Sequence, residues 1–124
     1  METTQATMTT QAVANRLAEL CRQGDFYTAQ QELYHENATS TEPEHTGWGT
    51  AQGTQAIIEK GKQWADSVAE FHGCTVSEPQ VSGNFFSVAM NVETTNKEGN
   101  RINMEELGVY EVRDGKVVSE QFFY

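Results

Sequence analysis

The first half of the chain carries apolar residues at the spacing typical of helices. Intervals of three and four predict helices over residues 9–24, 25–37 and 54–68, each opened by a side chain that can cap it. A short β-prone stretch at 38–42 separates the second and third helices, and a glycine-rich loop follows at 43–53. The apolar faces of these helices are formed by Val13, Leu17, Leu20, Cys21, Phe26, Ala29, Leu33, Tyr34, Ile57, Gly61, Trp64 and Val68.

Beyond residue 70 the apolar residues alternate with polar ones, which is the pattern of half-buried strands. Strands are predicted over 71–78, 86–93, 101–112 and 116–124, and Asp114-Gly115 joins the last two in a tight hairpin. Helices followed by an antiparallel meander define an α+β fold. A long twisted sheet of this kind curls around the helices and leaves a cavity between the two layers.

Length and charge limit the possible functions. The 124 residues form one domain, for which we expect a flexible polar lead-in at 1–8 and a single folded unit at 9–124. With 18 acidic and 8 basic residues the net charge is −10, which argues against binding to nucleic acids or anionic membranes. The sequence shows no secretory signal and no apolar run of about 18 residues, so we expect a cytoplasmic protein.

Cysteine and histidine positions do not indicate a metal or cofactor site. Cys21 and Cys74 lie far apart without a second pair, so we expect reduced thiols and no zinc. The segment Glu42-Pro43-Glu44-His45 offers three potential ligands, but they come from one loop rather than from separate elements. The glycines around Trp48 do not follow a strand and open a helix as a phosphate loop requires. We therefore expect neither a metal nor a cofactor.

Four short stretches, taken in order, carry a family resemblance: Gly24-Asp25, Ala38-Thr39 with Glu42-Pro43, Gly53-Thr54 with Ile57, and Asp114-Gly115-Lys116-Val117-Val118. They resemble the cone-shaped nuclear-transport-factor-like superfamily, and within it the SnoaL-like proteins and the ketosteroid isomerases. The resemblance spans about residues 9–124. It implies three N-terminal helices packed on a strongly curved antiparallel sheet, a cone-shaped α+β barrel, with an internal pocket. It implies no single function, because one scaffold supports isomerases, cyclases, dehydratases, epoxide hydrolases and binding modules.

The resemblance can be carried to individual catalytic positions. The isomerases place a carboxylate base before a proline at the end of the first strand, and here that position is Glu42. Their tyrosine donor on the first helix corresponds to Leu17, and their second donor, a protonated aspartic acid, corresponds to Gly108. The acid/base carboxylate of SnoaL-like cyclases also falls near Gly108. Because both hydrogen-bond donors are missing, the resemblance argues against steroid isomerisation by that mechanism.

In the family, alternate residues of the last two strands face the pocket. Carried over to this chain, that alternation implies inward-pointing side chains at Glu106, Val118, Glu120, Phe122 and Tyr124. Glu42, Glu106 and Glu120 are therefore the candidate catalytic residues, because burial raises a carboxyl pKa into the range useful for proton transfer. Glu42 could instead face solvent, and Glu106 could belong to a solvated strand edge. Predicted to line the pocket are Leu17, Tyr34, His45, Trp48, Trp64, Met90, Gly108, Tyr110 and Phe122, and the residues considered as replacement donors are Tyr34, Trp48, Trp64, His72 and Tyr110.

Two functional hypotheses follow. The first is an acid/base isomerase, cyclase or dehydratase without a cofactor, acting on a small hydrophobic carbonyl compound with Glu42 as general base. The alternative is a non-catalytic module on the same fold, used for binding a small ligand or for dimerisation. The partner is a small hydrophobic molecule in either case. Outward-facing Leu107 and Val109 also predict a homodimer through the outer face of the sheet.

Overall fold

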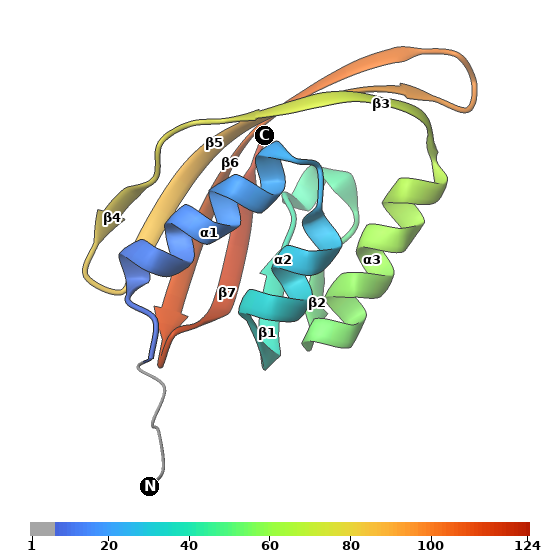
Figure 1. The fold of residues 1–124 in the computed structure, drawn as a ribbon. Coiled ribbons are helices and arrows are strands. Elements are labelled where there is room, and N and C mark those ends of the chain that lie inside the picture. Colours follow the sequence, from blue (N-terminus) through green and yellow to red (C-terminus); the bar gives the residue numbers. More distant parts are fainter. Residues whose placement is uncertain (1–6) are drawn as a thin grey trace, which may run out of the picture.

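The computed structural model describes residues 7–124, which form three helices on one side of a curved sheet (Figure 1). The helices are α1 (Thr10–Arg22), α2 (Phe26–Leu33) and α3 (Thr54–Asp66), with a short 3₁₀ turn, η1 (Glu44–Thr46). The strands are β1 (Tyr34–Thr41), β2 (Thr50–Gln52), β3 (Val68–Val76), β4 (Gln80–Ser82), β5 (Phe85–Asn96), β6 (Arg101–Arg113) and β7 (Lys116–Phe123). The predicted α+β class is confirmed. Residues 1–6 of the predicted lead-in lie outside the described residues.

The strands follow the order β2-β1-β7-β6-β5-β3, and β4 pairs with β5 beside this path. All pairs are antiparallel except β1 and β7, which run parallel because the chain returns to β1 only with its last strand. Within residues 7–124, β2 and β3 end the sheet without pairing to each other. The sheet is therefore mostly antiparallel, strongly curved and open, and the predicted fold of three helices on a strongly curved sheet is confirmed. No helix among the described residues has the length and apolar character needed to cross a membrane.

Capping explains where the first two helices begin. The Thr9 side chain accepts a hydrogen bond from the N–H of Ala12 at 3.0 Å, and Asp25 accepts one from the N–H of Thr28 at 3.1 Å. The cap of α3 is Gly53 rather than a threonine side chain. α2 ends at Leu33, earlier than the predicted residue 37, because the next residue adopts extended geometry and begins β1 directly.

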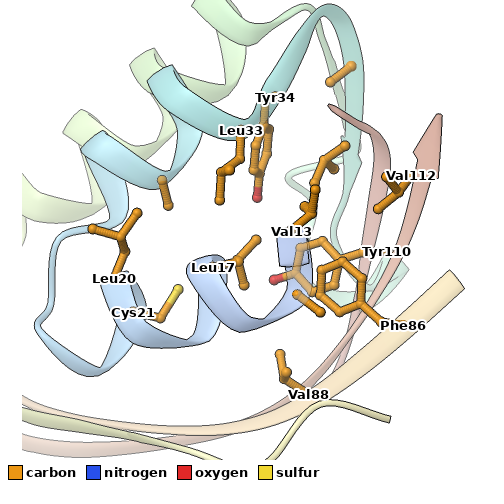
Figure 2. Close-up of a cluster of buried hydrophobic side chains, with 14 of the residues drawn as sticks. Val13, Leu17, Leu20, Cys21, Leu33, Tyr34, Phe86, Val88, Tyr110 and Val112 are labelled. Carbon is orange, nitrogen blue, oxygen red and sulfur yellow. The ribbon is translucent and has the colours of Figure 1, made fainter. Parts of the chain in front are cut away.

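The hydrophobic core lies under α1, at one end of the concave face of the sheet (Figure 2). Leu17 and Leu33 of the helices meet Phe86, Tyr110 and Val117 of the strands, and all five side chains are buried. Full burial of one aliphatic or aromatic side chain stabilises a fold by about 1.5–3 kcal/mol. This end of the interior is therefore filled, and it anchors the strands whose other ends reach the cavity described below.

A β-bulge in β7 changes which residues face inward. Glu111 pairs with Ser119 but Val112 pairs with Val117, so Val118 is an extra residue on this strand. As a result Val117 points into the core and Glu120, three residues later, also points inward. The parity prediction was wrong for Val118, which is only half-buried.

Candidate functional site

A cavity of about 740 Å³ lies between the helices and the sheet, next to the core. Its walls come from α2 and α3 on one side and from β3 and β5–β7 on the other. Of the residues predicted from the sequence, the following line it: Tyr34, Glu42, Trp48, Trp64, Met90, Glu106, Tyr110, Glu120 and Phe122. The fold therefore brings all three candidate carboxylates to one space.

An ion pair lies in the cavity wall. Lys60 Nζ is 3.0 Å from Glu42 Oε2, and the two side chains are only 18% and 11% exposed. The other oxygen, Glu42 Oε1, accepts a hydrogen bond from the Tyr124 hydroxyl at 2.8 Å. Lys60 also donates to Ser40 Oγ at 2.7 Å. Both carboxylate oxygens of Glu42 thus have a donor, which offsets the cost of removing this pair from water.

Glu120 lies deeper, where the cavity meets the core. Its side chain is 3% exposed, and its Oε1 accepts a hydrogen bond from the Tyr34 hydroxyl. Burial raises the pKa of Glu120, while hydrogen bonds from Ser40 and Tyr34 and the charge of Lys60 act in the opposite direction. Ser40 accepts from Lys60, so its own proton is free for Glu120, and the two carboxylates are connected through one ammonium and one hydroxyl.

Glu106 differs from the other two carboxylates. Burial, reinforced by the negative charges of Glu42 and Glu120, raises its pKa to about 7, and the charge of Lys60 partly opposes this. No hydrogen bond from the described residues contributes to this shift. A carboxyl group of this kind is present in both protonation states near neutral pH, so it can accept and return a proton.

Lys60 was not identified from the sequence, although a signal for it exists. It lies three residues after Ile57 and four before Trp64, so it shares the inward face of α3 with both. A lysine on a helix normally indicates the solvent side, because only its aliphatic stem tolerates burial. The partner that makes the inward position favourable, Glu42, comes from the end of β1, and sequence spacing alone does not bring the two together.

Three residues predicted to line the cavity do not line it. Leu17 is 1% exposed within the core under α1, because its helix packs directly on the strands. His45 lies in η1, and its ring packs edge-on against Tyr124, with the ring centres 6.0 Å apart. Gly108 is buried beneath the ring of Tyr110, which fills the space that a side chain there would need.

Two of the considered donors have other environments. The Nε2 atom of His72 is 2.7 Å from Thr95 Oγ1 on the neighbouring strand, and His72 is not part of the cavity wall. Trp48 lines the cavity but is half-exposed, in a loop between Gly47 and Gly49. Both glycines have positive φ angles, 75° and 67°, which other residues rarely adopt. Because it is half-exposed, Trp48 lies at the mouth of the cavity, and the carbonyl of its neighbour Gly49 accepts a hydrogen bond from the N–H of Glu42 at 3.1 Å.

The other end of the cavity is aromatic. The ring of Phe26 packs edge-on against Trp64 at 6.0 Å and against Phe71 at 6.3 Å between ring centres. Such a cluster offers apolar and π-face contacts to a planar ligand. The cavity thus combines a group of carboxyl, hydroxyl and ammonium side chains with an aromatic cluster, which is the usual composition of a site that binds a mostly hydrophobic molecule.

The cavity shows neither a metal cluster nor an activated thiol. Residues 7–124 contain no group of three or more His, Cys, Asp or Glu side chains arranged to hold a metal ion. Cys21 reaches the cavity wall, but burial raises the pKa of its thiol, and burial also raises that of Cys74 to about 11. Since the thiolate is the reactive form, these cysteines are poor nucleophiles. The chemistry of the site rests on its carboxyl, hydroxyl and ammonium groups.

Comparison with known proteins shows the family to which the chain belongs. The SnoaL-like domain family matches residues 8–124, so the protein belongs to this family, as predicted. A crystal structure from Mesorhizobium loti, described as a candidate SnoaL-like polyketide cyclase, is 31% identical, with a TM-score of 0.87 over 94% of this chain and 100% of that one. No curated protein matches the chain.

More distant structures share the fold. An NTF2-like protein of unknown function from Burkholderia pseudomallei is 19% identical, with a TM-score of 0.75 over 94% of this chain and 92% of that one. IdmH from Streptomyces antibioticus, a candidate polyketide cyclase, is 18% identical, with a TM-score of 0.74 over 94% and 91% of the two chains. At this identity the likeness concerns the fold alone, and it confirms the predicted nuclear-transport-factor-like architecture.

Proposed function

We propose that the protein is an acid–base enzyme that moves a proton on a small hydrophobic carbonyl compound, as an isomerase, cyclase or dehydratase. The observation that carries this proposal is Glu106, a carboxyl group with a pKa of about 7 facing a cavity of about 740 Å³. A base with this pKa is well matched to proton transfer at neutral pH. The resemblance to a candidate polyketide cyclase from Mesorhizobium loti also supports the proposal.

The proposed step begins with the ionised form of Glu106, which removes a proton from the carbon next to the substrate carbonyl. The electron pair of the broken C–H bond forms a carbon–carbon double bond, and the π pair of the carbonyl moves to its oxygen. The result is an enolate and a protonated Glu106. Where the enolate is conjugated with a further double bond, return of this proton to a more distant carbon completes an isomerisation. Attack of the enolate carbon on a second carbonyl carbon of the same molecule forms a carbon–carbon bond, the oxygen of that carbonyl takes the proton from Glu106, and the result is a cyclisation. Neither route consumes an oxidant or a reductant.

Glu42, the base expected from the resemblance, has a different role in this proposal. Both of its oxygens already accept hydrogen bonds, from Lys60 and from Tyr124, whereas Glu106 is free to meet a substrate. The negative charge of Glu42 raises the pKa of Glu106 and the positive charge of Lys60 lowers it. We therefore propose that the ion pair positions Lys60 and sets the pKa of the base.

Exchange of carbon-bound protons tests this function directly. We expect the protein to accelerate the exchange of the α-protons of 2-tetralone, a bicyclic ketone, into D₂O, with a rate that rises as the pH passes about 7. Glu106→Gln should lower the rate on the order of 10²–10⁴-fold, the usual contribution of a general base. Glu105→Gln, on the adjacent exposed residue, is the matched control and should leave the rate unchanged.

Three outcomes would contradict parts of this assignment. Full activity in Glu106→Gln, with loss of activity in Glu42→Gln, would return the role of base to Glu42. Full activity in both variants would show that neither carboxylate is the base. If 2-tetralone binds to the wild-type protein without any exchange, a non-catalytic binding module, the alternative function, becomes the better description.

We also propose that the protein forms a homodimer through the outer face of the sheet. Leu107 and Phe123 pair across β6 and β7 on this face and are 42% and 48% exposed, and they form an apolar patch there. Light scattering should give the mass of a dimer for the wild-type protein and of a monomer for Leu107→Glu. A monomeric wild-type protein would rule this interface out.

A further inference from the structure

The side chain of Tyr110 is a rigid polar feature of the cavity wall. Its ring stacks on Phe86 (Figure 2), with the ring centres 4.6 Å apart and the planes at 9°. It also meets the ring of Phe122 edge-on, with the ring centres 6.3 Å apart. Tyr110 as a whole is 2% exposed. A hydroxyl on a ring held from two sides has a fixed position, so it is organised before any ligand arrives.

Gly108 makes this position possible. A Cβ atom at residue 108 would lie 2.8 Å from Cε1 of Tyr110 and 3.0 Å from its hydroxyl oxygen, closer than such contacts allow. The two residues are two apart on β6 and face the same side, so the tyrosine lies back across the glycine. The hydroxyl therefore occupies the space that a side chain at residue 108 would fill.

The Tyr110 hydroxyl also differs from the hydroxyls of Tyr34 and Tyr124, which line the same cavity. Tyr34 donates to Glu120, and Tyr124 donates to Glu42 at 2.8 Å. Tyr110 donates no hydrogen bond to any group among the described residues. Its hydroxyl oxygen is also not a fully buried atom that lacks a partner. An unpaired hydroxyl at the wall of a cavity can hydrogen-bond to a ligand without breaking a bond within the protein.

We propose that the Tyr110 hydroxyl donates a hydrogen bond to the carbonyl oxygen of the substrate and stabilises the enolate that forms there. This assignment rests on the function proposed above, and it supplies the donor that neither Leu17 nor Gly108 can provide. Burial, together with the charge of Glu120, raises the pKa of Tyr110, so the hydroxyl stays protonated at neutral pH and remains a donor. A fixed donor in a water-poor site favours the enolate oxygen over the ground-state carbonyl, because the oxygen gains charge during the step.

The test uses infrared spectroscopy of 2-tetralone labelled with ¹³C at its carbonyl. A hydrogen bond lowers the stretching frequency of a bound carbonyl, so this readout reports the donor whether or not the ketone reacts. We expect a lowered frequency in the wild-type complex and a return towards the unbonded frequency in Tyr110→Phe. The exchange rate of this variant should fall on the order of 10²–10³-fold. Folding should survive, because the lost hydroxyl has no partner within the described chain.

Tyr34→Phe is the matched control, because it removes a second buried tyrosine hydroxyl that is already bonded to Glu120. It should keep the lowered carbonyl frequency. Gly108→Ala is a second probe: it keeps the Tyr110 hydroxyl but displaces the ring, so it should also weaken the frequency shift.

The proposal is overturned if the carbonyl frequency is the same in wild type and Tyr110→Phe, or if no lowered frequency appears with the wild-type protein. A shift that depends on Tyr110 without any proton exchange would leave the donor assignment standing and refute the proposed function. Proton exchange that depends on Glu106 but not on Tyr110 would do the reverse.

Discussion

The two ends of the interior show how one sheet serves two purposes. Under α1, Leu17 packs against apolar side chains, with Val112 and Val117 contributed by β6 and β7. Further along the same two strands, Glu106 and Glu120 face the cavity. The filled end gains stability from apolar burial, whereas the open end holds carboxyl groups whose ionised forms are disfavoured by their surroundings. The chain therefore concentrates its stability away from its candidate chemistry.

The largest predicted change is a loss of stability caused by a substitution at the filled end, under α1. Leu17→Ala leaves a space in the core and should lower the free energy of unfolding by about 2–5 kcal/mol. Urea denaturation followed by circular dichroism measures this change. Ile102→Ala, at a 41% exposed position, is the control and should cost about 0.5 kcal/mol or less. Equal losses in both variants would mean that the region under α1 is not the main source of stability.

At the open end the corresponding change should stabilise the protein. The pKa of Glu106 is raised to about 7 in the folded state from an ordinary 4.5, so folding favours its protonated form. Its favourable contribution is complete below about pH 4.5 and is lost as the pH rises through about 7. Glu106→Gln should therefore raise the free energy of unfolding at pH 8 by up to about 3 kcal/mol, with almost no gain at pH 4.

Denaturation series at several pH values measure that gain, and Glu105→Gln at the exposed neighbouring position should show none of it. If the free energy of unfolding depends on pH in the same way in the wild type and in Glu106→Gln, the site does not disfavour the ionised form of Glu106. The proposed difference between the two ends of the interior would then be wrong.

The smallest expected effect concerns the ion pair. Lys60→Gln removes a positive charge that lowers the pKa of Glu106, so the pKa should rise. Glu42→Gln removes a negative charge that raises it, so the pKa should fall. NMR titration of ¹³C-labelled glutamate carboxyl groups follows both changes. Shifts of the same sign in the two variants would contradict the proposal that this ion pair sets the pKa of the base.

Local sequence signals predicted the frame of the molecule well. Caps at Thr9 and Asp25 and the change of hydrophobic period near residue 70 depend on neighbouring residues only, and the predicted class and family are confirmed. Tyr34 was placed on the second helix because its spacing fits a helical face. Pairing with Val117, which is 83 positions away, makes it part of β1 instead. A short stretch of sequence does not show that a residue will pair with a distant strand, although that pairing decides its secondary structure.

The sequence predicted the carboxyl groups of the candidate site but not the residues that contact them. Alternation along the strands, with the inward face taken from the family resemblance, pointed Glu106 and Glu120 inward. The Lys60–Glu42 pair depends on how α3 is oriented over β1, which packing decides. Crowding between Gly108 and the ring of Tyr110 depends on a rotamer. Residue types therefore indicated which chemistry was available, and tertiary packing selected the groups that meet.

The bulge at Val118 has a consequence for how such proteins change over evolutionary time. Deleting Val118, the extra residue, would leave Val117, Ser119 and Glu120 in regular alternation, so Glu120 and Phe122 would still face the cavity. Val117, before the bulge, would stay in the core. Loss of the bulge with Val118 retained would instead reverse the facing of every later residue, and Ser119 and Gln121 would replace Glu120 and Phe122 at the cavity wall in one event. Substitution at individual sites would need several intermediates to reach the same result, so this strand is a natural place for diversification and for redesign.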